Sequence, residues 1–399
     1  MFFRPLRQLA LLALVALAAC GGGNSSSYTA AAAQLQKATA TAHLQKSADA
    51  AIAGGLAGVV LNHITPIDAA QAQAGLRQVG TTAKVQADDA FMIGSTTKAM
   101  TSALAARLVE RGTIAWTTTL AEALPDLAAG MQAGYRVITL EQLLGHRGGL
   151  LAFTSPADIG RFQAFLVGYD GELPATLAGR ERFFAAWLLA QDPPPGVKPG
   201  QDFAYSNAGY AMAALMLEAR AGRPFAELFE QDLTQPLGMT VSWTSSDQTF
   251  TNRPVGHDGA KGKLVALTPE DTDTAAWLNV LRPGGVGTTI TADSYANWVR
   301  WHLRALRGEA TPLPASYLQR LKTLRHGDYA LGWVAIDIDG RAVLAHDGEY
   351  RGFSSLLIMD MQGRSASFGF TNTEADDGAW VMAVLNQAVS DVARALLPR

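Results

Sequence analysis

Cysteine is nearly absent from this sequence, and its scarcity narrows what the chain can be. Cys20 is the only cysteine among 399 residues, so no disulfide can form within the chain. The seven histidines never occur in an H-E-x-x-H or similar spacing, so the sequence supports neither a metal site nor a cofactor. A formal net charge of −3 argues against a nucleic-acid partner. After residue 20, no run is long and apolar enough to span a bilayer.

The first twenty residues have the pattern of a targeting segment. Arg4 and Arg7 form a basic start, and the apolar stretch that follows, at 9–18, is too short for a membrane-spanning helix. The letters LAAC at 17–20 resemble a bacterial lipobox, in which the cysteine is freed by cleavage and lipidated. We therefore expect residues 1–20 to be a lipoprotein signal peptide ending in Cys20. The alternative is an ordinary secretory signal that is cut nearby.

The expected lipid on Cys20 also suggests a location. Gly21, rather than aspartate, follows the cysteine, which resembles the outer-membrane address of bacterial lipoproteins. We expect a protein held by its lipid at the periplasmic face of a bacterial membrane, with the outer membrane favoured. Residues 21–33, which begin GGGNSSS, are predicted to be a flexible tether to the folded body.

Strand and helix patterns divide the rest of the chain into three blocks. Strand-like runs occur at 56–64 and 75–79 and return after residue 261, whereas helical windows rich in Ala and Leu fill the middle. We predict one α/β domain of the α+β type from residues 34–111 and 261–399, with an all-helical domain, 112–260, inserted in it. The expected fold is an antiparallel sheet flanked by helices from both ends of the chain.

A serine and a lysine three residues apart stand at the start of a predicted helix. Ser95 follows the apolar run FMI and Gly94, and Lys98 lies one helical turn further on. A serine hydroxyl becomes a good nucleophile when a neighbouring base removes its proton. No other serine in the sequence has a lysine three residues later. The competing interpretation is an ordinary helix N-cap followed by a solvated lysine.

Tyr205 and Asn207 lie where a proline-rich loop runs into another predicted helix. A phenol and an amide two residues apart at such a point can both face one cleft, and a tyrosine can relay a proton once a cation lowers its pKa. The competing interpretation makes Asn207 the helix N-cap beside a packed aromatic ring. Tyr295 and Asn297 share the spacing, but they lie in mid-helix, where residues two apart diverge. We therefore set that pair aside.

The tripeptide His346-Asp347-Gly348 is predicted to follow a strand and a turn. An imidazole and free backbone N–H groups at a strand edge can serve a ligand. His257-Asp258-Gly259 repeats the tripeptide in a glycine-rich loop for which we predict no strand on either side, so we set it aside. His146, in a helix-like segment, is expected to be structural.

The S-T-T-K, Y-S-N and H-D-G motifs, in this order, resemble those of the serine hydrolases of the class C β-lactamase, DD-peptidase and esterase superfamily. The similar sequence blocks span roughly residues 34 to 397. They begin with FMIGS at 91–95 and continue with ITLEQLLGHRGGL at 138–150, PG at 199–200, YSNAGY at 205–210, PLGM at 236–239, PGG at 283–285, YALGW at 329–333, and HDG through GF at 346–353. The resemblance implies a β-lactamase/transpeptidase-like fold.

The resemblance also implies roles for individual residues. Ser95 would be the acylated nucleophile, with Lys98 as its base or the partner of its base. Tyr205 would act on the leaving group and later on water, while Asn207 would orient the substrate and Lys98. His346 stands where many relatives have lysine.

The same resemblance implies an oxyanion hole and a surface that binds the substrate. The backbone N–H groups of Ser95 and Glu349 would form the hole, a contribution typically worth about 2.7–4 kcal/mol per donor. Asp347 and Gly348 would contact the substrate. Either Lys98 or Tyr205 would be the acylation base, so we treat the two as a coupled pair.

Asp347 departs from the family pattern, in which the middle residue of this motif is usually Thr, Ser or Gly. An ionised Asp347 in the cleft would repel the carboxylate of a β-lactam or a D-Ala-D-Ala peptide, and replacing lysine by His346 weakens the attraction further. We expect neutral or amine-bearing acyl substrates. Ester hydrolysis ranks first, a DD-peptidase or D-aminopeptidase activity second, and a β-lactamase activity third.

A non-catalytic lipoprotein that keeps this fold as a binding module is the alternative of another class. It predicts no covalent labelling of Ser95 by a serine-directed reagent. The expected partners are a small-molecule or short-peptide acyl substrate and, through Cys20, a membrane. The sequence leaves the oligomeric state open.

Overall fold

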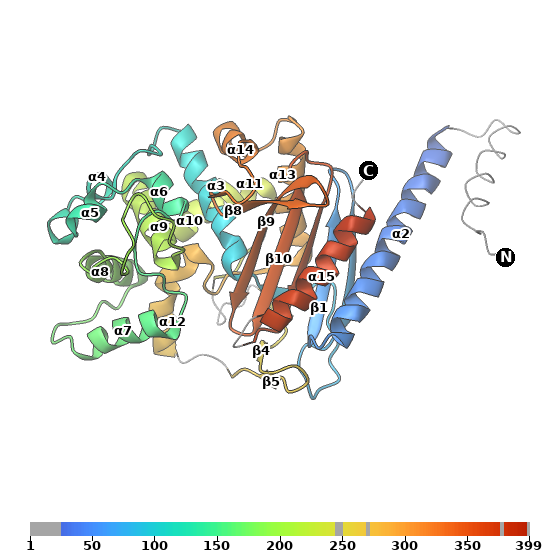
Figure 1. Ribbon diagram of the computed structural model, residues 1–399, viewed down its shortest axis with the longest axis horizontal. Helices are drawn as coiled ribbons and strands as arrows, with labels where there is room; N and C mark the ends of the chain where they lie inside the picture. Colours follow the sequence, from blue (N-terminus) through green and yellow to red (C-terminus); the bar gives the residue numbers. More distant parts are fainter. Residues whose placement is uncertain (1–24, 244–249, 269–271, 376–378, 397–399) are drawn as a thin grey trace, which may run out of the picture.

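A seven-stranded antiparallel sheet lies at the centre of the protein (Figure 1). The computed structural model describes residues 25–243, 250–268, 272–375 and 379–396, with side chains from residue 34 onward. The strand order is β2-β1-β11-β10-β9-β8-β7, so strands from both ends of the chain pair with one another. The strands are β1 (Gly58–Ile64), β2 (Ala69–Gly75), β7 (Tyr329–Ala330), β8 (Trp333–Ile338), β9 (Arg341–Tyr350), β10 (Phe353–Asp360) and β11 (Ala366–Thr371).

Two helices from opposite ends of the chain cover one face of the sheet. They are α2 (Ser25–Ala53) and α15 (Ala379–Leu396), and they pack against each other and the sheet (Figure 1). Side chains alternate along β1, so Val59 and Leu61 join the core beneath these helices, whereas Val60 joins the core of the opposite face. The predicted antiparallel sheet with flanking terminal helices is therefore confirmed.

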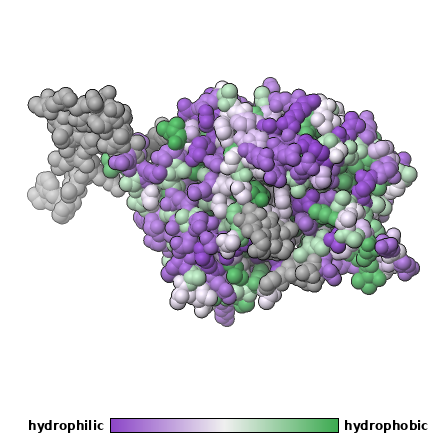
Figure 2. Space-filling model, turned by 180° about the vertical axis from the view of Figure 1, so that it is seen from behind, coloured by the Kyte–Doolittle hydropathy of each residue, from purple (hydrophilic) through white to green (hydrophobic). Residues whose placement is uncertain are grey.

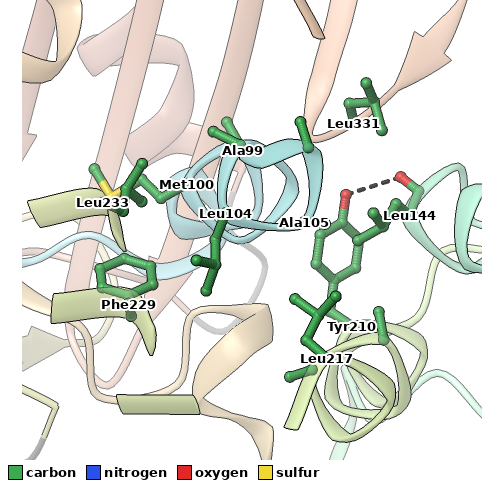
Figure 3. Close-up of a cluster of buried hydrophobic side chains, with 14 of the residues drawn as sticks. Ala99, Met100, Leu104, Ala105, Leu144, Tyr210, Leu217, Phe229, Leu233 and Leu331 are labelled. Carbon is green, nitrogen blue, oxygen red and sulfur yellow. Dashed lines mark hydrogen bonds between the residues drawn. The ribbon is translucent and has the colours of Figure 1, made fainter. Parts of the chain in front are cut away.

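The central helix of the opposite face is α3 (Thr97–Glu110), which carries the predicted lysine. Its apolar residues are buried around most of the circumference, as in a helix enclosed by protein. Figure 3 shows Met100 and Leu104 of α3 among Phe229, Leu233 and other apolar side chains. The same core also contains residues of β3 (Ala90–Met92), β6 (Thr289–Thr291), α13 (Ala292–Leu306) and α14 (Ala315–Lys322).

Helices from the middle of the chain pack beyond α3 (Figure 1). Two of them, α4 and α6, begin with a capping box in which a threonine and the third helical residue satisfy each other's backbone. The helices of this region are α4 (Leu120–Ala123), η3 (Ala128–Gly130), α5 (Ala133–Arg136), α6 (Leu140–Leu144), α7 (Pro156–Val167), α8 (Leu177–Leu189), α9 (Asn207–Ala221), α10 (Phe225–Phe229), η4 (Glu230–Thr234), α11 (Gln235–Leu237), α12 (Thr272–Leu278) and η5 (Asn279–Gly284). The predicted domain boundaries at 111 and 261 stay predictions.

Several local predictions are wrong. Residues 25–33, assigned to a flexible tether, belong to α2. The second strand occupies Ala69–Gly75 rather than 75–79, because the alternating Ala and Gln residues of AAQAQAG give a weak strand signal. His346-Asp347-Gly348 lies within β9 instead of after a strand. A two-residue strand, β4 (His257–Asp258), pairs with β5 (Val265–Ala266) where no strand was predicted.

Within the described ranges, no helix combines the length and the apolar character needed to cross a bilayer. On the face shown in Figure 2, hydrophilic residues cover much of the surface and hydrophobic residues occur in small separate groups. Cys20 lies outside the described residues, so its lipidation stays a prediction.

Candidate active site

Ser95 lies in a tight turn that leads directly into α3. The 3₁₀ turn η2 (Gly94–Thr96) holds it, and α3 begins two residues later, so Lys98 lies one turn further along the same side. The Lys98 amine is 2.9 Å from the Ser95 hydroxyl oxygen. Ser95 is partly exposed, whereas Lys98 has no solvent-accessible surface. The structure therefore brings a reachable hydroxyl next to a buried amine.

Three oxygen atoms surround the Lys98 nitrogen. They determine where the N–H groups and the lone pair of the amine point. Besides Ser95, the amine contacts the side-chain oxygen of Asn207 and the carbonyl oxygen of Gly284, each at 2.6 Å. Burial lowers the pKa of Lys98 well below its usual value, and the charge of Asp347 raises it only in part. A neutral amine has two N–H donors for Asn207 and Gly284. Its lone pair then points to Ser95 and can accept the hydroxyl proton.

Asn207 is held in the orientation that Lys98 requires. Its amide nitrogen donates to the Phe153 carbonyl at 2.9 Å, which turns its oxygen toward Lys98. The N-cap of α9 is Ser206, whose hydroxyl accepts the Gly209 N–H at 2.9 Å. The interpretation of Asn207 as a helix cap is therefore wrong, because its neighbour fills that position.

Tyr205 completes the group around Ser95. Its ring centroid lies 4.6 Å from the Lys98 nitrogen. Burial raises the pKa of Tyr205 well above its usual value, and the nearby Ser95 hydroxyl lowers it by less. This pKa is therefore not lowered in the way that a proton relay beside a cation would require, because the phenol is itself buried. Tyr205 is a neutral phenol and can donate a proton.

The backbones of the Ser95 turn and of β9 touch each other. A Cβ added to Gly348 would lie 2.6 Å from the Ser95 nitrogen, and one added to Gly94 would lie 2.6 Å from the Glu349 nitrogen. Gly94 also has a φ of +48°, which other residues rarely adopt. Glycine at both positions therefore allows the backbone amides of Ser95 and Glu349 to lie side by side, as an oxyanion hole requires.

A chain of hydrogen bonds extends from the site through two buried histidines. The Ser206 N–H donates to Nδ1 of His146 at 3.1 Å, and Nε2 of His146 lies 3.0 Å from the Tyr329 hydroxyl. That hydroxyl lies 3.3 Å from Nε2 of His346, whose Nδ1 lies 2.5 Å from the Asp347 carbonyl oxygen. At one end the Ser206 N–H can only donate, and at the other end the Asp347 carbonyl can only accept. If both imidazole rings are neutral, these two ends allow only one arrangement of protons along the chain.

The proton positions follow from both ends of this chain. Nε2 of His146 donates to Tyr329, Tyr329 donates to Nε2 of His346, and Nδ1 of His346 donates to the Asp347 carbonyl. Burial lowers the pKa of His146 to about 2 and that of His346 to about 4. Both imidazoles are therefore uncharged near neutral pH, and His346 supplies no positive charge where many relatives have lysine.

Acidic side chains lie at the exposed side of the site. Asp347 and Glu349 are exposed on β9, and the charge of Asp347 raises the pKa of Lys98 and His346. Desolvation raises the pKa of Glu349, and the Asp347 charge raises it further. The Asp347 carboxylate is thus close enough to act on the reacting groups, so an anionic group of a substrate would meet repulsion there.

The pairing of β8 with β9 ends before the residues next to Ser95. In the register of the described strands, β8 pairs with β9 only from Arg341 to Ala345. No described strand therefore lies beside residues 346–349 on that side.

Comparison with known proteins identifies the family. The model of the family described as Beta-lactamase matches residues 30–389. The chain belongs to the Beta-lactamase family. Among curated proteins it is similar to Unguisins hydrolase ungD' of Aspergillus campestris, with 26% identity over 71% of this chain and 52% of the relative. It is also similar to Penicillin-binding protein 4 of Amycolatopsis lactamdurans, with 27% identity over 72% and 74%.

Solved structures of the family share the fold. The D-amino acid amidase of Ochrobactrum anthropi SV3, complexed with L-phenylalanine amide, has a TM-score of 0.70 at 19% identity and covers 90% of this chain and 98% of its own. This likeness supports the fold alone. The chain spans about half the length of the first curated relatives it matches. Hydrolases, peptidases and amidases occur among the relatives and structural neighbours of this Beta-lactamase family member.

The repeated motifs that we set aside have other surroundings. Tyr295 is buried in the core, and Asn297 donates to the Gly238 carbonyl at 2.8 Å. His257 is buried among backbone groups, where its Nε2 accepts the Val79 N–H at 3.0 Å. The reason given for setting His257 aside, a loop without strands, was wrong because it lies in a short strand.

Three groups that contact the site were given no role by sequence reasoning. They are the Gly284 carbonyl, the Tyr329 hydroxyl and the His146 ring, which lies 4.1 Å from the Tyr205 ring between centroids. Gly284 and Tyr329 lie in the Pro-Gly-Gly and Tyr-Ala-Leu-Gly-Trp blocks, which were recognised as similar to family sequences. That similarity was the sequence feature that could have indicated a role for these residues. His146, which we expected to be structural, contacts both Tyr205 and Tyr329, and its role stays a prediction.

Proposed function

We propose that this protein is a serine hydrolase that forms an acyl-enzyme on Ser95 and cleaves an ester or amide whose acyl group is neutral or carries an amine. The contacts of the Lys98 nitrogen carry this proposal. The nitrogen donates to the side-chain oxygen of Asn207 and to the carbonyl oxygen of Gly284, and its third contact is the Ser95 hydroxyl. Nothing in a purely structural helix N-terminus requires a buried, neutral lysine at that point.

The proposed reaction begins when the Lys98 amine accepts the Ser95 proton as the oxygen attacks the substrate carbonyl. The N–H groups of Ser95 and Glu349 bind the oxyanion, and the neutral phenol of Tyr205 gives its proton to the leaving group. Lys98, now protonated, returns a proton to Tyr205. Water then attacks the acyl-enzyme, loses a proton to the same pair, and Ser95 regains its hydrogen as the acid is released.

The substrate preference follows from the charges at the site. Asp347 and Glu349 lie on the exposed side of β9, whereas burial lowers the pKa of His346 to about 4 and that of Lys98 well below its usual value. We rank neutral esters first. An amide of an amino acid with a free amine ranks second, because a cationic amine would be attracted to Asp347. A β-lactam with its carboxylate ranks third.

Two assays test this proposal. A fluorophosphonate should label the wild type and not Ser95→Ala, and the adduct should map to Ser95. p-Nitrophenyl butyrate should be cleaved more efficiently than nitrocefin, with D-phenylalanine amide as the amine-bearing comparison. Efficient nitrocefin turnover without ester cleavage would reverse the ranking. A correctly folded wild type that takes no label would support a non-catalytic binding module instead.

We also propose that Cys20 carries a lipid that holds the protein at the periplasmic face of a bacterial membrane. The lipobox-like segment at 17–20 supports this proposal. In a bacterial host, radioactive palmitate should label the wild type and not Cys20→Ala. An unlabelled wild-type protein recovered in the soluble fraction would contradict the anchor and leave the hydrolase proposal unaffected.

A further inference from the structure

The end of η5 and the residue that follows it touch both reacting groups. The carbonyl oxygen of Gly284, the last residue of η5, lies 2.6 Å from the Lys98 nitrogen. The next residue packs against the nucleophile's own backbone, since a Cβ added to Gly285 would lie 2.9 Å from the Ser95 nitrogen. A small shift of η5 would therefore move an oxygen that contacts the amine and disturb the turn that holds the hydroxyl.

Arg282, two residues before Gly284, ties this segment to α8. One of its terminal nitrogens lies 3.0 Å from a carboxyl oxygen of Glu181, and both side chains are buried. Its guanidinium also lies 5.8 Å from the centre of the Phe225 ring. A buried ion pair adds little net stability over apolar side chains of similar size, because both charges lose their hydration. What such a pair does provide is a fixed distance between the two elements that carry it.

Glu218 brings α9 to the same place. The charge of Arg282 lowers the pKa of Glu181 and that of Glu218, against a larger rise caused by burial, so the guanidinium lies near both carboxyls. Glu181, Glu218 and Pro283 also line one cavity of about 10 Å³, room for a single water. η5 packs along α9, whose first residue, Asn207, supplies the second acceptor of the buried amine. Both acceptors thus lie on elements that Arg282 joins.

We propose that Arg282 is a positioning residue: its contact with Glu181 holds the Gly284 carbonyl where the buried amine meets it. Both N–H groups of a neutral Lys98 then have acceptors, and its lone pair faces the Ser95 hydroxyl. Without that contact η5 can shift, the amine can turn, and the hydroxyl loses its base. The inference rests on the proposed function, because it concerns the base of that reaction.

The alternative is that the ion pair only stabilises the fold, and a double variant separates the two roles. Glu181→Met/Arg282→Met replaces both charges with apolar side chains, so its free energy of unfolding should stay near that of the wild type. The rate of fluorophosphonate labelling of Ser95 should nevertheless fall roughly 10- to 100-fold, the effect of a displacement of about 1 Å at a reacting group. The rates are compared on the high-pH plateau, where Lys98 has lost its proton in every variant, so a shifted pKa does not contribute.

Two single variants sharpen this test. Arg282→Met should show the same fall in labelling as the double variant. Glu181 tolerates the loss of its partner, because burial raises its pKa to about 7 and the carboxyl takes up a proton more readily once the neighbouring charge is gone. Glu181→Gln is the conservative variant, since it keeps an oxygen facing Arg282 and should retain most of the rate.

Arg364→Met is the matched control. Arg364 pairs with the buried carboxylate of Asp360, the last residue of β10, with 2.7 Å between the two groups. That pair joins β10 to the turn that follows it, not to η5. Its loss should lower the free energy of unfolding and leave the labelling rate of Ser95 unchanged.

Three results would overturn the inference. One is a double variant with wild-type stability and a wild-type labelling rate. Another is a rate in Glu181→Gln as low as that of the double variant, because the oxygen is still in place. The third is an equal loss of rate in Arg364→Met, which would make slow labelling a general consequence of a broken ion pair.

A crystal structure of the double variant separates this inference from the proposed function. The Gly284 carbonyl should lie outside hydrogen-bonding distance of the Lys98 nitrogen. A displaced carbonyl, in a protein whose wild type takes no label, would refute the hydrolase and keep the positioning role. A labelled wild type, together with an unmoved carbonyl in the variant, would do the reverse.

Discussion

The tripeptide His-Asp-Gly occurs twice in this protein, and the two copies have different surroundings. His257 is held by backbone groups and one side chain, since its Nε2 accepts the Val79 N–H and its Nδ1 lies 2.9 Å from the Asn372 carbonyl oxygen and 3.4 Å from the Asn372 side-chain nitrogen. His346 has one backbone contact, and its Nε2 faces the Tyr329 hydroxyl at 3.3 Å, beside the Ser95 site. The same three residues therefore hold loops together in one place and border a reactive group in the other.

The difference shows that chemistry here depends on what surrounds a residue. His346 lies on β9, and the nearby residues 348–349 of this strand contact the Ser95 turn. His257 lies on a two-residue strand that forms a bridge to Thr373. Burial lowers the pKa of both histidines. A lowered pKa alone thus does not mark a functional histidine, and the partners of the ring decide.

Among substitutions around Ser95 and His346, removal of the Lys98 amine should lower activity the most. We expect Lys98→Met to lower kcat/KM for ester hydrolysis by roughly 10⁴-fold, because the base that activates Ser95 is lost. Methionine has similar length and removes a buried polar group without leaving a charge. Circular dichroism should show a native fold. Residual activity within tenfold of the wild type would refute Lys98 as the base.

Tyr205→Phe should come next, with an effect that depends on the leaving group. A phenol that donates a proton matters most for amines and alkoxides, which leave poorly without one. We expect a loss of roughly 10²-fold for an amide or alkyl ester. A p-nitrophenyl ester should lose less, since its leaving group needs no proton. Equal losses for both substrates would contradict the role of Tyr205 as a proton donor.

Parallel substitutions of the two histidines test the comparison directly. His346→Asn should lower kcat/KM about tenfold, because the shorter side chain no longer reaches the Tyr329 hydroxyl, and should change stability little. His257→Asn should leave kcat/KM nearly unchanged and lower the free energy of unfolding by about 1–3 kcal/mol, because the backbone groups around it lose their partner. Urea unfolding and ester kinetics measure both effects. A pattern in which both variants lose activity alike would erase the distinction.

An effect on stability rather than on catalysis should appear in its pH dependence. Burial lowers the pKa of His346, His302 and His63 to about 4, from 6.5. Between these values the unfolded state binds protons that the folded state does not, so stability falls as the pH falls from about 6.5 toward 4. Each histidine contributes up to about 1.4 kcal/mol per pH unit. Urea unfolding at pH 7 and pH 5 measures the loss, and equal stabilities would contradict buried neutral histidines.

The parts of the site that sequence patterns could predict are those set by local geometry. The three-residue spacing of Ser95 and Lys98 fixes their relation along one helical turn, and the loop before α9 brings Tyr205 and Asn207 together. The sheet was predictable because short apolar runs mark β1 and β10 and aromatic residues mark β11.

The remaining contacts depend on long-range packing. The Gly284 carbonyl reaches Lys98 from 186 residues away, and its role comes from a backbone atom that every residue has. Tyr329 and His146 meet only because β7 and the end of α6 pack together. The tether and the second strand were missed for another reason, since the sequence at 25–33 and 69–75 favours no structure strongly by itself.

The pH dependence of Ser95 modification tests the central claim that a neutral Lys98 activates this serine. The rate of fluorophosphonate labelling of Ser95 should rise with pH through a midpoint far below 10.5, the ordinary pKa of lysine, because the buried amine loses its proton early. A midpoint at or above 10.5, or a label that appears on any residue other than Ser95, would contradict the claim.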